Sequence, residues 1–153
     1  MNKALFLDRD GTINVEKNYL YKIEDFEFIP EIFDICRKAE AEGYLLIVIT
    51  NQSGVSRGYY NETQMNLCNQ YMINKFKEYG ITITDVFCCT SINDEDFDRK
   101  PNPGMFLKAK EKYNIDMSKS ISIGDKARDI EAAKKAGVKQ NYFIQELLSR
   151  RNF

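Results

Sequence analysis

The sequence predicts an α/β fold, a three-layer sandwich in which a mostly parallel sheet lies between two layers of helices. Five short segments rich in apolar, β-branched or aromatic residues are typical of buried strands: 4–7, 45–49, 86–89, 121–123 and 142–144. Four helical stretches are expected between them: 30–42, 62–79, 103–113 and 127–136. Because strands and helices alternate, functional loops are expected at the carboxyl ends of parallel strands.

Proline and glycine support these helix boundaries. Pro30 and Pro103 stand where two helices begin, a position where the missing N–H of proline costs nothing. Three helices are followed by a glycine, which often ends a helix: Gly43, Gly80 and Gly137. Two long irregular segments, 14–28 and 90–103, follow the first and third strands. Loops of this length often carry function.

Length and composition favour one compact domain over residues 1–153. The chain is 43% hydrophobic, and no internal repeat or Pro/Gly/Ser-rich linker divides it. Its 4 cysteines lack the spacing of a disulfide framework, and no signal-peptide segment precedes Asp8, so we expect a reducing, cytoplasmic location. No apolar run approaches the ~20 residues that span a bilayer, so no membrane partner is expected.

Several chemistries are excluded by what the composition lacks. The chain has no histidine, which rules out phosphohistidine intermediates, Ser-His-Asp hydrolysis and imidazole zinc sites. No Cys-x5-Arg loop and no Walker A sequence occurs. The net charge of -1 lacks the basic excess of a nucleic-acid binder, so nucleic acid is not an expected partner. Carboxylates remain as the candidate reactive groups.

Two carboxylates one residue apart follow the first predicted strand. Asp8 and Asp10 lie in Asp-Arg-Asp-Gly-Thr, where Gly11 lets the backbone approach a phosphate closely. Their mutual repulsion is relieved by a hard cation such as Mg²⁺, which prefers oxygen ligands. A polar helix-capping turn is the alternative. An EF-hand is excluded, because Ile13 and Tyr19 occupy the positions that need Gly and Glu.

The second strand ends in Thr50-Asn51-Gln52-Ser53-Gly54, with Arg57 close behind. Hydroxyl, amide and backbone groups of this kind suit phosphate oxygens, although a helix-capping turn fits the same residues.

Cationic and acidic residues follow the third and fourth strands. Arg99 and Lys100 precede Pro101, which restricts the conformation of Lys100, so Lys100 is a candidate to neutralise a phosphate. A solvated basic loop is the alternative. After the fourth strand, Asp125 is a candidate metal ligand, and Asp129 fits either support of the metal shell or stabilisation of a helix N-terminus.

Taken together, the four strand ends resemble the haloacid-dehalogenase superfamily. The order Asp-x-Asp-Gly-Thr, Thr, Lys, Gly-Asp extends the resemblance from Lys3 to about Ile144 and implies a Rossmann-like sheet, here without a large cap domain. Within the superfamily, the motifs are most similar to D-glycero-D-manno-heptose 1,7-bisphosphate 7-phosphatases of lipopolysaccharide biosynthesis. Histidinol-phosphate phosphatases share most of them.

This resemblance implies a Mg²⁺-dependent phosphatase that acts on a small sugar phosphate. The metal ligands would be Asp8, the Asp10 carbonyl and Asp125. Asp8, already ionised at neutral pH, would be the nucleophile, Asp10 the general acid and base, and Lys100 a counter-charge, while Thr50 and Asn51 orient the phosphate. The residues implied to contact the sugar or a second phosphate are Glu16, Lys17, Asn18, Tyr19, Gln52, Ser53, Arg57, Arg99 and Lys126.

The chain departs from this branch at its zinc loop. Relatives in the branch use Cys-x-His followed by Cys-x-Cys before the Arg-Lys pair. Here Cys89 matches the first ligand, but Ser91 replaces the histidine and residues 96–98 read Asp-Phe-Asp. No structural zinc is therefore predicted, and residues 93–98 are expected to form a solvated acidic loop.

Two non-enzymatic functions remain to be weighed, a phosphoacceptor signalling domain and a noncatalytic phosphate-binding protein. A receiver domain carries its phosphorylated Asp after the third strand, where this chain has Cys88-Cys89-Thr90. The complete set of reactive residues argues against a degenerate site. Surface patterning shows no oligomer seam, so a monomer is expected.

Overall fold

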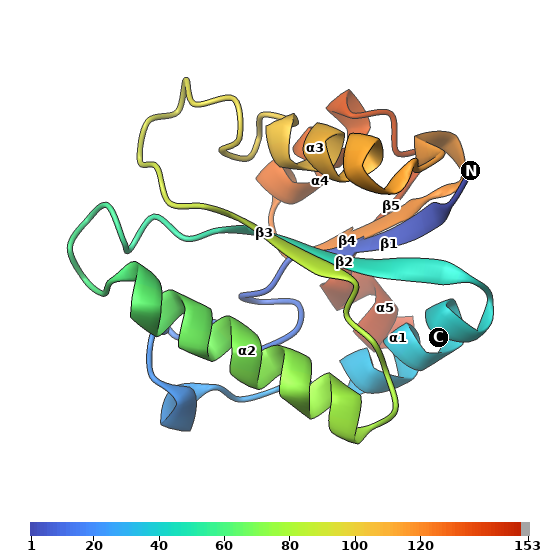
Figure 1. Ribbon diagram of the computed structural model, residues 1–153. Coiled ribbons are helices and arrows are strands. Elements are labelled where there is room, and N and C mark those ends of the chain that lie inside the picture. The colour runs from blue at the N-terminus through green and yellow to red at the C-terminus, as the bar shows by residue number, and fades with distance from the viewer. Residues whose placement is uncertain (151–153) are drawn as a thin grey trace.

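A computed structural model describes residues 1–150 and has a five-stranded, wholly parallel sheet at its centre (Figure 1). The strand order is β3-β2-β1-β4-β5. The strands are β1 (Lys3–Leu7), β2 (Tyr44–Asn51), β3 (Asp85–Cys89), β4 (Ile121–Gly124) and β5 (Gln140–Phe143). The predicted α/β fold is confirmed. Residues 151–153, the end of the single domain expected from the sequence, lie outside the described residues.

Five α-helices and two 3₁₀ helices complete the described chain. They are α1 (Glu31–Ala41), α2 (Glu62–Glu78), α3 (Gly104–Tyr113), α4 (Ala127–Lys135), α5 (Ile144–Arg150), η1 (Ile23–Asp25) and η2 (Met117–Lys119). Helix α5 was not predicted: Ile144, expected to end the last strand, is the first residue of this helix and is buried. None of the helices in residues 1–150 has the length and apolarity needed to cross a bilayer.

Alternate side chains of β1 fill two separate cores, as expected for a strand whose faces are both covered. Ala4 and Phe6 face the core beneath α3 and α4. Leu5 and Leu7 face the core that contains residues of α1, α2 and α5. Figure 1 shows these two helix layers on opposite faces of the sheet. The rigid β1 therefore carries the segment that follows it to a fixed place at the edge of the sheet.

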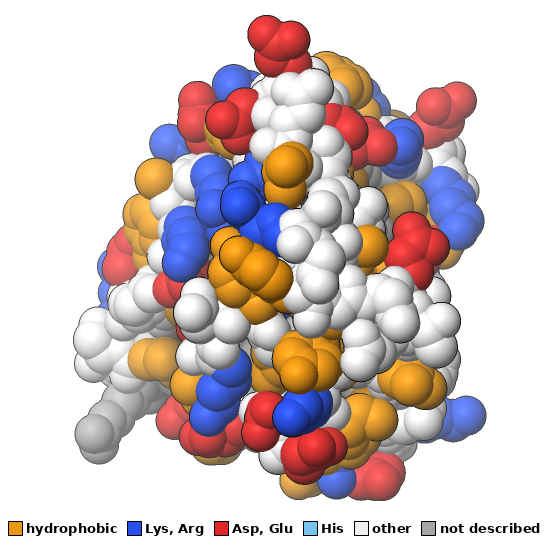
Figure 2. Space-filling view, turned by 90° about the vertical axis from the view of Figure 1, so that its left-hand side faces the viewer, with side chains coloured by type: hydrophobic (Ala, Val, Ile, Leu, Met, Phe, Trp, Pro, Cys, Tyr) orange, Lys and Arg blue, Asp and Glu red, His pale blue; other side chains and the backbone are white. Residues whose placement is uncertain are grey.

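The carboxyl ends of the strands meet at one edge, and the long loops gather there (Figure 1). These loops are the segment between β1 and α1, the segment between β2 and α2, and residues 90–103 after β3. Seen from this edge, Lys and Arg side chains gather beside exposed hydrophobic side chains (Figure 2). All four sequence motifs therefore lie on one face of the molecule.

Candidate active site

A buried lysine joins two carboxylates at the centre of this edge. Lys100 Nζ lies 2.9 Å from Asp8 Oδ1 and 2.7 Å from Asp129 Oδ1, and it donates to the Ile49 carbonyl at 2.7 Å. The lysine is 2% exposed. Burial alone would lower the pKa of Lys100, but the two carboxylates raise it. Lys100 is therefore a fixed positive charge beneath Asp8.

Burial also dominates the acidity of Asp8. It raises the pKa of Asp8 to about 7, and the nearby Lys100 only partly opposes this effect. The sequence-based expectation that Asp8 is fully ionised at neutral pH therefore does not hold for the protein alone. A further cation beside Asp8 would favour the ionised carboxylate.

Asp129 stabilises a helix N-terminus, one of the two roles that its position had suggested, and also pairs with Lys100, a contact that was not foreseen. Its Oδ2 accepts from the backbone N–H groups of Asp125 at 3.0 Å and Lys126 at 2.9 Å, at the start of α4. Its Oδ1 pairs with Lys100. A Cβ at Gly124 would lie 2.4 Å from the Asp129 Cβ, so glycine is required for this close packing. Asp129 thus links the fourth strand end to the Asp8–Lys100 pair.

Asn51 connects β2 to the loop that carries Lys100. Its Nδ2 donates to the Lys100 carbonyl at 3.1 Å, and its Oδ1 accepts from the Lys100 N–H at 3.0 Å. Both hydrogen-bonding ends of the amide are therefore engaged by the Lys100 backbone. The side chain expected to orient a phosphate here orients the lysine.

Oxygen atoms suited to a divalent cation lie around Gly11. The backbone at Gly11 has φ +90°, and a Cβ there would lie 2.2 Å from Asp125 Oδ2, so Asp125 sits directly against the turn of Asp8 and Asp10. Within residues 1–150 no cluster of three His, Cys, Asp or Glu side chains forms a metal site. A site made of the Asp8 carboxylate, the Asp125 carboxylate and the Asp10 backbone carbonyl contains only two such side chains, so it does not require a cluster of three. These oxygens fit the hard-ligand preference of Mg²⁺.

Asp10 is held by donors on a different side of the site. Its Oδ1 accepts from Asn14 Nδ2 at 2.9 Å, its Oδ2 accepts from Gln52 Nε2 at 2.9 Å, and Arg9 Nη2 lies 3.2 Å from both oxygens. Arg9 is fully buried and also donates to Asn69 of α2 at 2.9 Å. Each catalytic candidate, Asp8 and Asp10, therefore has its own buried cation.

A tyrosine sets the orientation of the Gln52 amide. The Tyr60 hydroxyl donates to Gln52 Oε1, which leaves Gln52 Nε2 to donate to Asp10 and, at 2.9 Å, to Thr50 Oγ1. Burial raises the pKa of Tyr60 to about 12, so the hydroxyl keeps its proton at neutral pH. Tyr60 therefore acts on Asp10 through Gln52.

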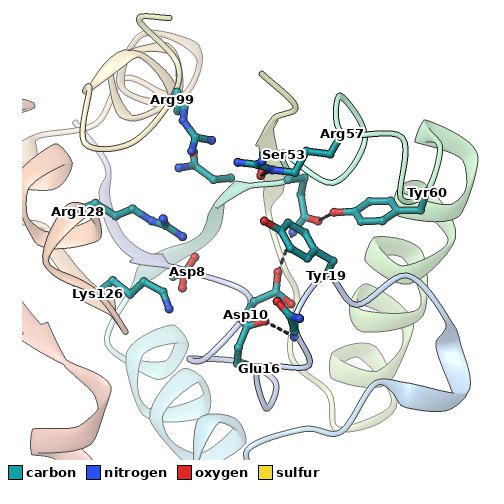
Figure 3. A pocket seen from close by; sticks show the side chains of 13 residues that line it. Asp8, Asp10, Glu16, Tyr19, Ser53, Arg57, Tyr60, Arg99, Lys126 and Arg128 are labelled. Atoms are coloured by element: carbon teal, nitrogen blue, oxygen red, sulfur yellow. Dashed lines mark hydrogen bonds between the residues drawn. The ribbon is translucent and has the colours of Figure 1, made fainter. Parts of the chain in front are cut away.

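Asp8 and Asp10 border a cavity of about 330 Å³ that opens at the carboxyl edge of the sheet (Figure 3). It is lined by Asp8, Asp10, Glu16, Asn18, Tyr19, Asn51, Gln52, Ser53, Arg57, Tyr60, Arg99, Lys126 and Arg128. Most of the predicted substrate contacts lie here. Lys17 does not, because its ammonium pairs with Glu27 at 3.0 Å outside the cavity.

Comparison with known proteins places the chain in a family. Residues 3–143 match the family model of the polynucleotide kinase 3 phosphatases, a group of the haloacid-dehalogenase superfamily. The chain belongs to this phosphatase family. It is 45% identical to a D-glycero-alpha-D-manno-heptose-1,7-bisphosphate 7-phosphatase of Campylobacter jejuni, over 94% of this chain and 83% of that protein.

Two further relatives bear on substrate and cofactor. A D-glycero-beta-D-manno-heptose-1,7-bisphosphate 7-phosphatase of Haemophilus influenzae is 38% identical over 95% of this chain and 83% of that protein. The crystal structure of the D,D-heptose 1,7-bisphosphate phosphatase from B. bronchiseptica, complexed with magnesium and phosphate, superposes with a TM-score of 0.85. That match covers 97% of this chain and 86% of the other at 25% identity.

In this member of the family, hydrogen bonds organise the loop in which the branch's zinc ligands are replaced. Asn102 Nδ2 donates to the carbonyls of Asp94 at 2.9 Å and Asp96 at 2.8 Å. Arg99 donates through Nη1 to the Ser91 carbonyl at 3.0 Å, and its Nε lies 3.2 Å from Asp94 Oδ1. The loop expected to be solvated and acidic is mostly exposed, and it is also folded around Arg99 and Asn102.

Sequence motifs did not identify every residue of this phosphatase site. Arg9, Tyr60 and Arg128 were missed, and so was Gln145 of α5, whose amide donates to Asp125 Oδ1. Arg9 lies inside the first motif, between the two aspartates, so its position was a usable signal. Tyr60 and Arg128 carry no signal beyond nearness to Arg57 and Lys126.

Proposed function

We propose that this protein removes the 7-phosphate of a D-glycero-D-manno-heptose 1,7-bisphosphate, with Mg²⁺, through an aspartyl-phosphate formed on Asp8. The observation that carries the proposal is the buried Asp8–Lys100–Asp129 arrangement, in which Asp8 lines a cavity with a cationic rim and Lys100 and Asp129 lie behind it. Such a site offers a carboxylate nucleophile and a fixed counter-charge to an anionic substrate.

In the first step, Asp8 Oδ attacks phosphorus as the bond from phosphorus to the sugar oxygen breaks. Asp10 protonates the departing oxygen. In the second step, Asp10 takes a proton from water, which attacks the aspartyl-phosphate and releases inorganic phosphate and free Asp8. Lys100 stays charged throughout and offsets the negative charge that gathers beside Asp8.

The residues around Gly11 fit a magnesium ion, which would be held by Asp8, the Asp10 carbonyl and Asp125. When bound, the ion neutralises phosphate oxygens. Burial raises the pKa of Asp8, and a cation held there would favour the ionised, nucleophilic form. Gln145 would help to fix the Asp125 carboxylate.

Substrate recognition is assigned to the two sides of the cavity. On one side, the Arg57 guanidinium carbon lies 5.8 Å from the centroid of the Tyr19 ring. The Tyr19 ring can cover a sugar face. Glu16 and Asn18 offer polar groups to sugar hydroxyls, and Ser53 offers a hydroxyl to phosphate. Arg99 and Lys126 line the other side (Figure 3).

Several wider assignments accompany this proposal. Both anomers of the bisphosphate occur among the relatives' substrates, so the proposal names the heptose bisphosphate and leaves the anomer to measurement. The pathway would be nucleotide-heptose supply for lipopolysaccharide or capsule. A single domain over residues 1–153, acting as a monomer in the cytoplasm, would suffice, and the 4 free cysteines fit a reducing compartment.

The test is a substrate panel with purified protein. It compares kcat/KM for the α and β anomers of heptose 1,7-bisphosphate, heptose 7-phosphate, histidinol phosphate and other sugar phosphates. We expect a heptose bisphosphate to be preferred by at least about tenfold, and activity to vanish when EDTA removes Mg²⁺. A higher kcat/KM for histidinol phosphate would refute the substrate, and a stable phosphoprotein without turnover would refute the enzyme.

A further inference from the structure

The cavity contains two kinds of charge that differ in how they are compensated. Its carboxylates Asp8 and Asp10 already have buried cations of their own, Lys100 and Arg9. Glu16 is the third acidic residue of the cavity lining, and its Oε1 accepts from the Asn18 N–H at 2.7 Å. The rim cations therefore face a cavity with little anionic charge of its own to neutralise them.

Four cations line this rim: Arg57, Arg99, Lys126 and Arg128. Three of them have partners in the protein. Arg57 donates to Ser53 Oγ at 3.2 Å, Arg99 pairs with Asp94 at 3.2 Å, and Lys126 Nζ lies 3.6 Å from Asp125 Oδ2. These contacts hold the three side chains and offset part of the charge of Arg99 and Lys126.

Arg128 differs from the other three. It lies in the first turn of α4, two residues after Lys126, and is exposed. Among residues 1–150, no side chain forms an ion pair or hydrogen bond with its guanidinium within the distances that define the other three contacts. Figure 3 shows Arg128 and Lys126 on the side of Asp8, below Arg99, whereas Arg57 and Tyr19 lie across the cavity.

From this asymmetry we infer that Arg128 is a specificity-determining residue that binds the second, non-reacting phosphate of the substrate, together with Arg99 and Lys126. The inference rests on the proposed function, because a second phosphate exists only in a bisphosphate. A guanidinium without a protein partner keeps its planar set of donors for the oxygens of a phosphate monoester. Arg57, stacked on Tyr19, is assigned to the sugar side.

The experiment measures the ratio of kcat/KM for heptose 1,7-bisphosphate to that for heptose 7-phosphate. In Arg128→Gln this ratio is expected to fall about tenfold, the scale of one lost charged contact in a discriminating site. Arg128→Lys should retain part of the ratio, because a point charge replaces the planar donors. The control is Lys134→Gln, which removes a charge from an exposed position of the same helix outside the cavity lining, and it should keep the wild-type ratio.

The outcomes separate the inference from the proposed function. If the wild-type protein prefers the bisphosphate and Arg128→Gln has the same ratio as the wild type, the inference about Arg128 is overturned and the proposed function stands. An equal loss on both substrates also overturns the inference, because Arg128 would then act on the reacting phosphate or on the fold. If the wild-type protein does not prefer the bisphosphate, the assigned substrate fails together with the inference. Raising the salt concentration should weaken the preference of the wild type more than that of Arg128→Gln.

Discussion

The floor and the rim of the cavity are built in different ways. At the floor, Asp8 directly follows β1 and Asp129 lies in the first turn of α4. Lys100 belongs to the loop after β3, but it is buried and is tied to both carboxylates by contacts of 2.9 Å or less. On the rim, Tyr19, Arg57 and Arg99 belong to loops, and Arg128 is an exposed side chain without a protein partner in the described chain. The floor is thus preorganised, and the rim can adapt.

This difference separates chemistry from selectivity. A nucleophile and its counter-charge must be held in a fixed geometry before the substrate arrives, because reorganisation during the reaction would add to the barrier. Recognition of a particular sugar needs contacts that vary without disturbing that geometry, and exposed loops permit this. A change at the floor should therefore alter kcat by orders of magnitude, whereas a change on the rim should mainly alter KM and substrate preference.

The largest effect is expected from Asp8→Asn. The amide keeps the size of the side chain but removes the nucleophilic oxygen, so hydrolysis should fall by about 10⁴-fold or more. Far-UV circular dichroism should match that of the wild type. Because the burial penalty on ionised Asp8 is removed, the melting temperature without Mg²⁺ should not decrease at pH 8. Substantial turnover by a correctly folded variant would contradict the assignment of Asp8.

A smaller effect is expected where floor and rim meet, at Tyr60. Tyr60→Phe keeps the ring but removes the hydroxyl that fixes the Gln52 amide, so the amide can turn its oxygen toward Asp10. A loss of about 1 kcal/mol in transition-state stabilisation would lower kcat by roughly fivefold to tenfold. KM should stay near the wild-type value.

Tyr21→Phe is the matched control for this prediction. Its ring stacks on Tyr60 with centroids 5.9 Å apart, and within residues 1–150 its hydroxyl forms no hydrogen bond to a side chain. Removing that hydroxyl should leave kcat unchanged. Equal losses in the two variants, both of which keep the aromatic stack, would contradict a specific role of the Tyr60–Gln52 hydrogen bond.

The sequence was most informative about the floor. Strand periodicity together with the spacing of Asp8, Lys100 and Asp125 predicted the parallel sheet and the convergence of the motifs, because parallel strands end at the same edge. Contacts between motifs were less predictable. The hydrogen bonds between the Asn51 side chain and the Lys100 backbone join residues 49 positions apart and depend on the loop conformation. Short-range patterns contain no information about such a pairing.

The rim was predicted less well for a related reason. Lys17 is adjacent to Glu16, yet Glu16 lines the cavity and Lys17 pairs with Glu27. Asn18 and Tyr19 have positive φ values of 55° and 72°, so the chain turns at this point and neighbouring side chains point in different directions. Helix α5 was missed because its first residue, Ile144, continues the apolar run of the preceding strand.

Asn102→Ala should have a moderate effect confined to the rim. The amide links the carbonyls of Asp94 and Asp96, and its loss should loosen the loop that holds Arg99. We expect KM for the bisphosphate to rise about threefold to tenfold with little change in kcat, and the melting temperature to fall by a few degrees, as about 1 kcal/mol predicts. Elemental analysis should find no stoichiometric zinc in either protein. One zinc per chain would mean that a metal, not these hydrogen bonds, holds the loop.

The smallest effect is expected at the ion pair between Lys112 and Asp85, which is more exposed than the Lys100–Asp129 pair at the floor. Lys112 Nζ lies 2.7 Å from Asp85 Oδ2 at the start of β3, and the Tyr113 hydroxyl donates to the same oxygen at 2.6 Å. Partial burial would raise the pKa of Asp85, but the hydrogen bonds from Lys112 and Tyr113 outweigh it and lower the pKa below 3.8. Asp85→Asn should therefore cost at most about 1 kcal/mol at pH 7, because solvent screens this pair.

The pH dependence of this loss has a defined sign. A carboxyl whose pKa is lower in the folded state contributes its full stability above the unfolded value of 3.8, and the contribution disappears as the pH falls through the folded value. Urea unfolding of wild type and Asp85→Asn should thus differ at pH 7 and converge as the pH falls below 3.8, with kcat unchanged in the variant at neutral pH. A loss of several kcal/mol would show that the pair is as strongly coupled to the fold as the buried Lys100–Asp129 pair, and the contrast between buried and exposed charge would fail.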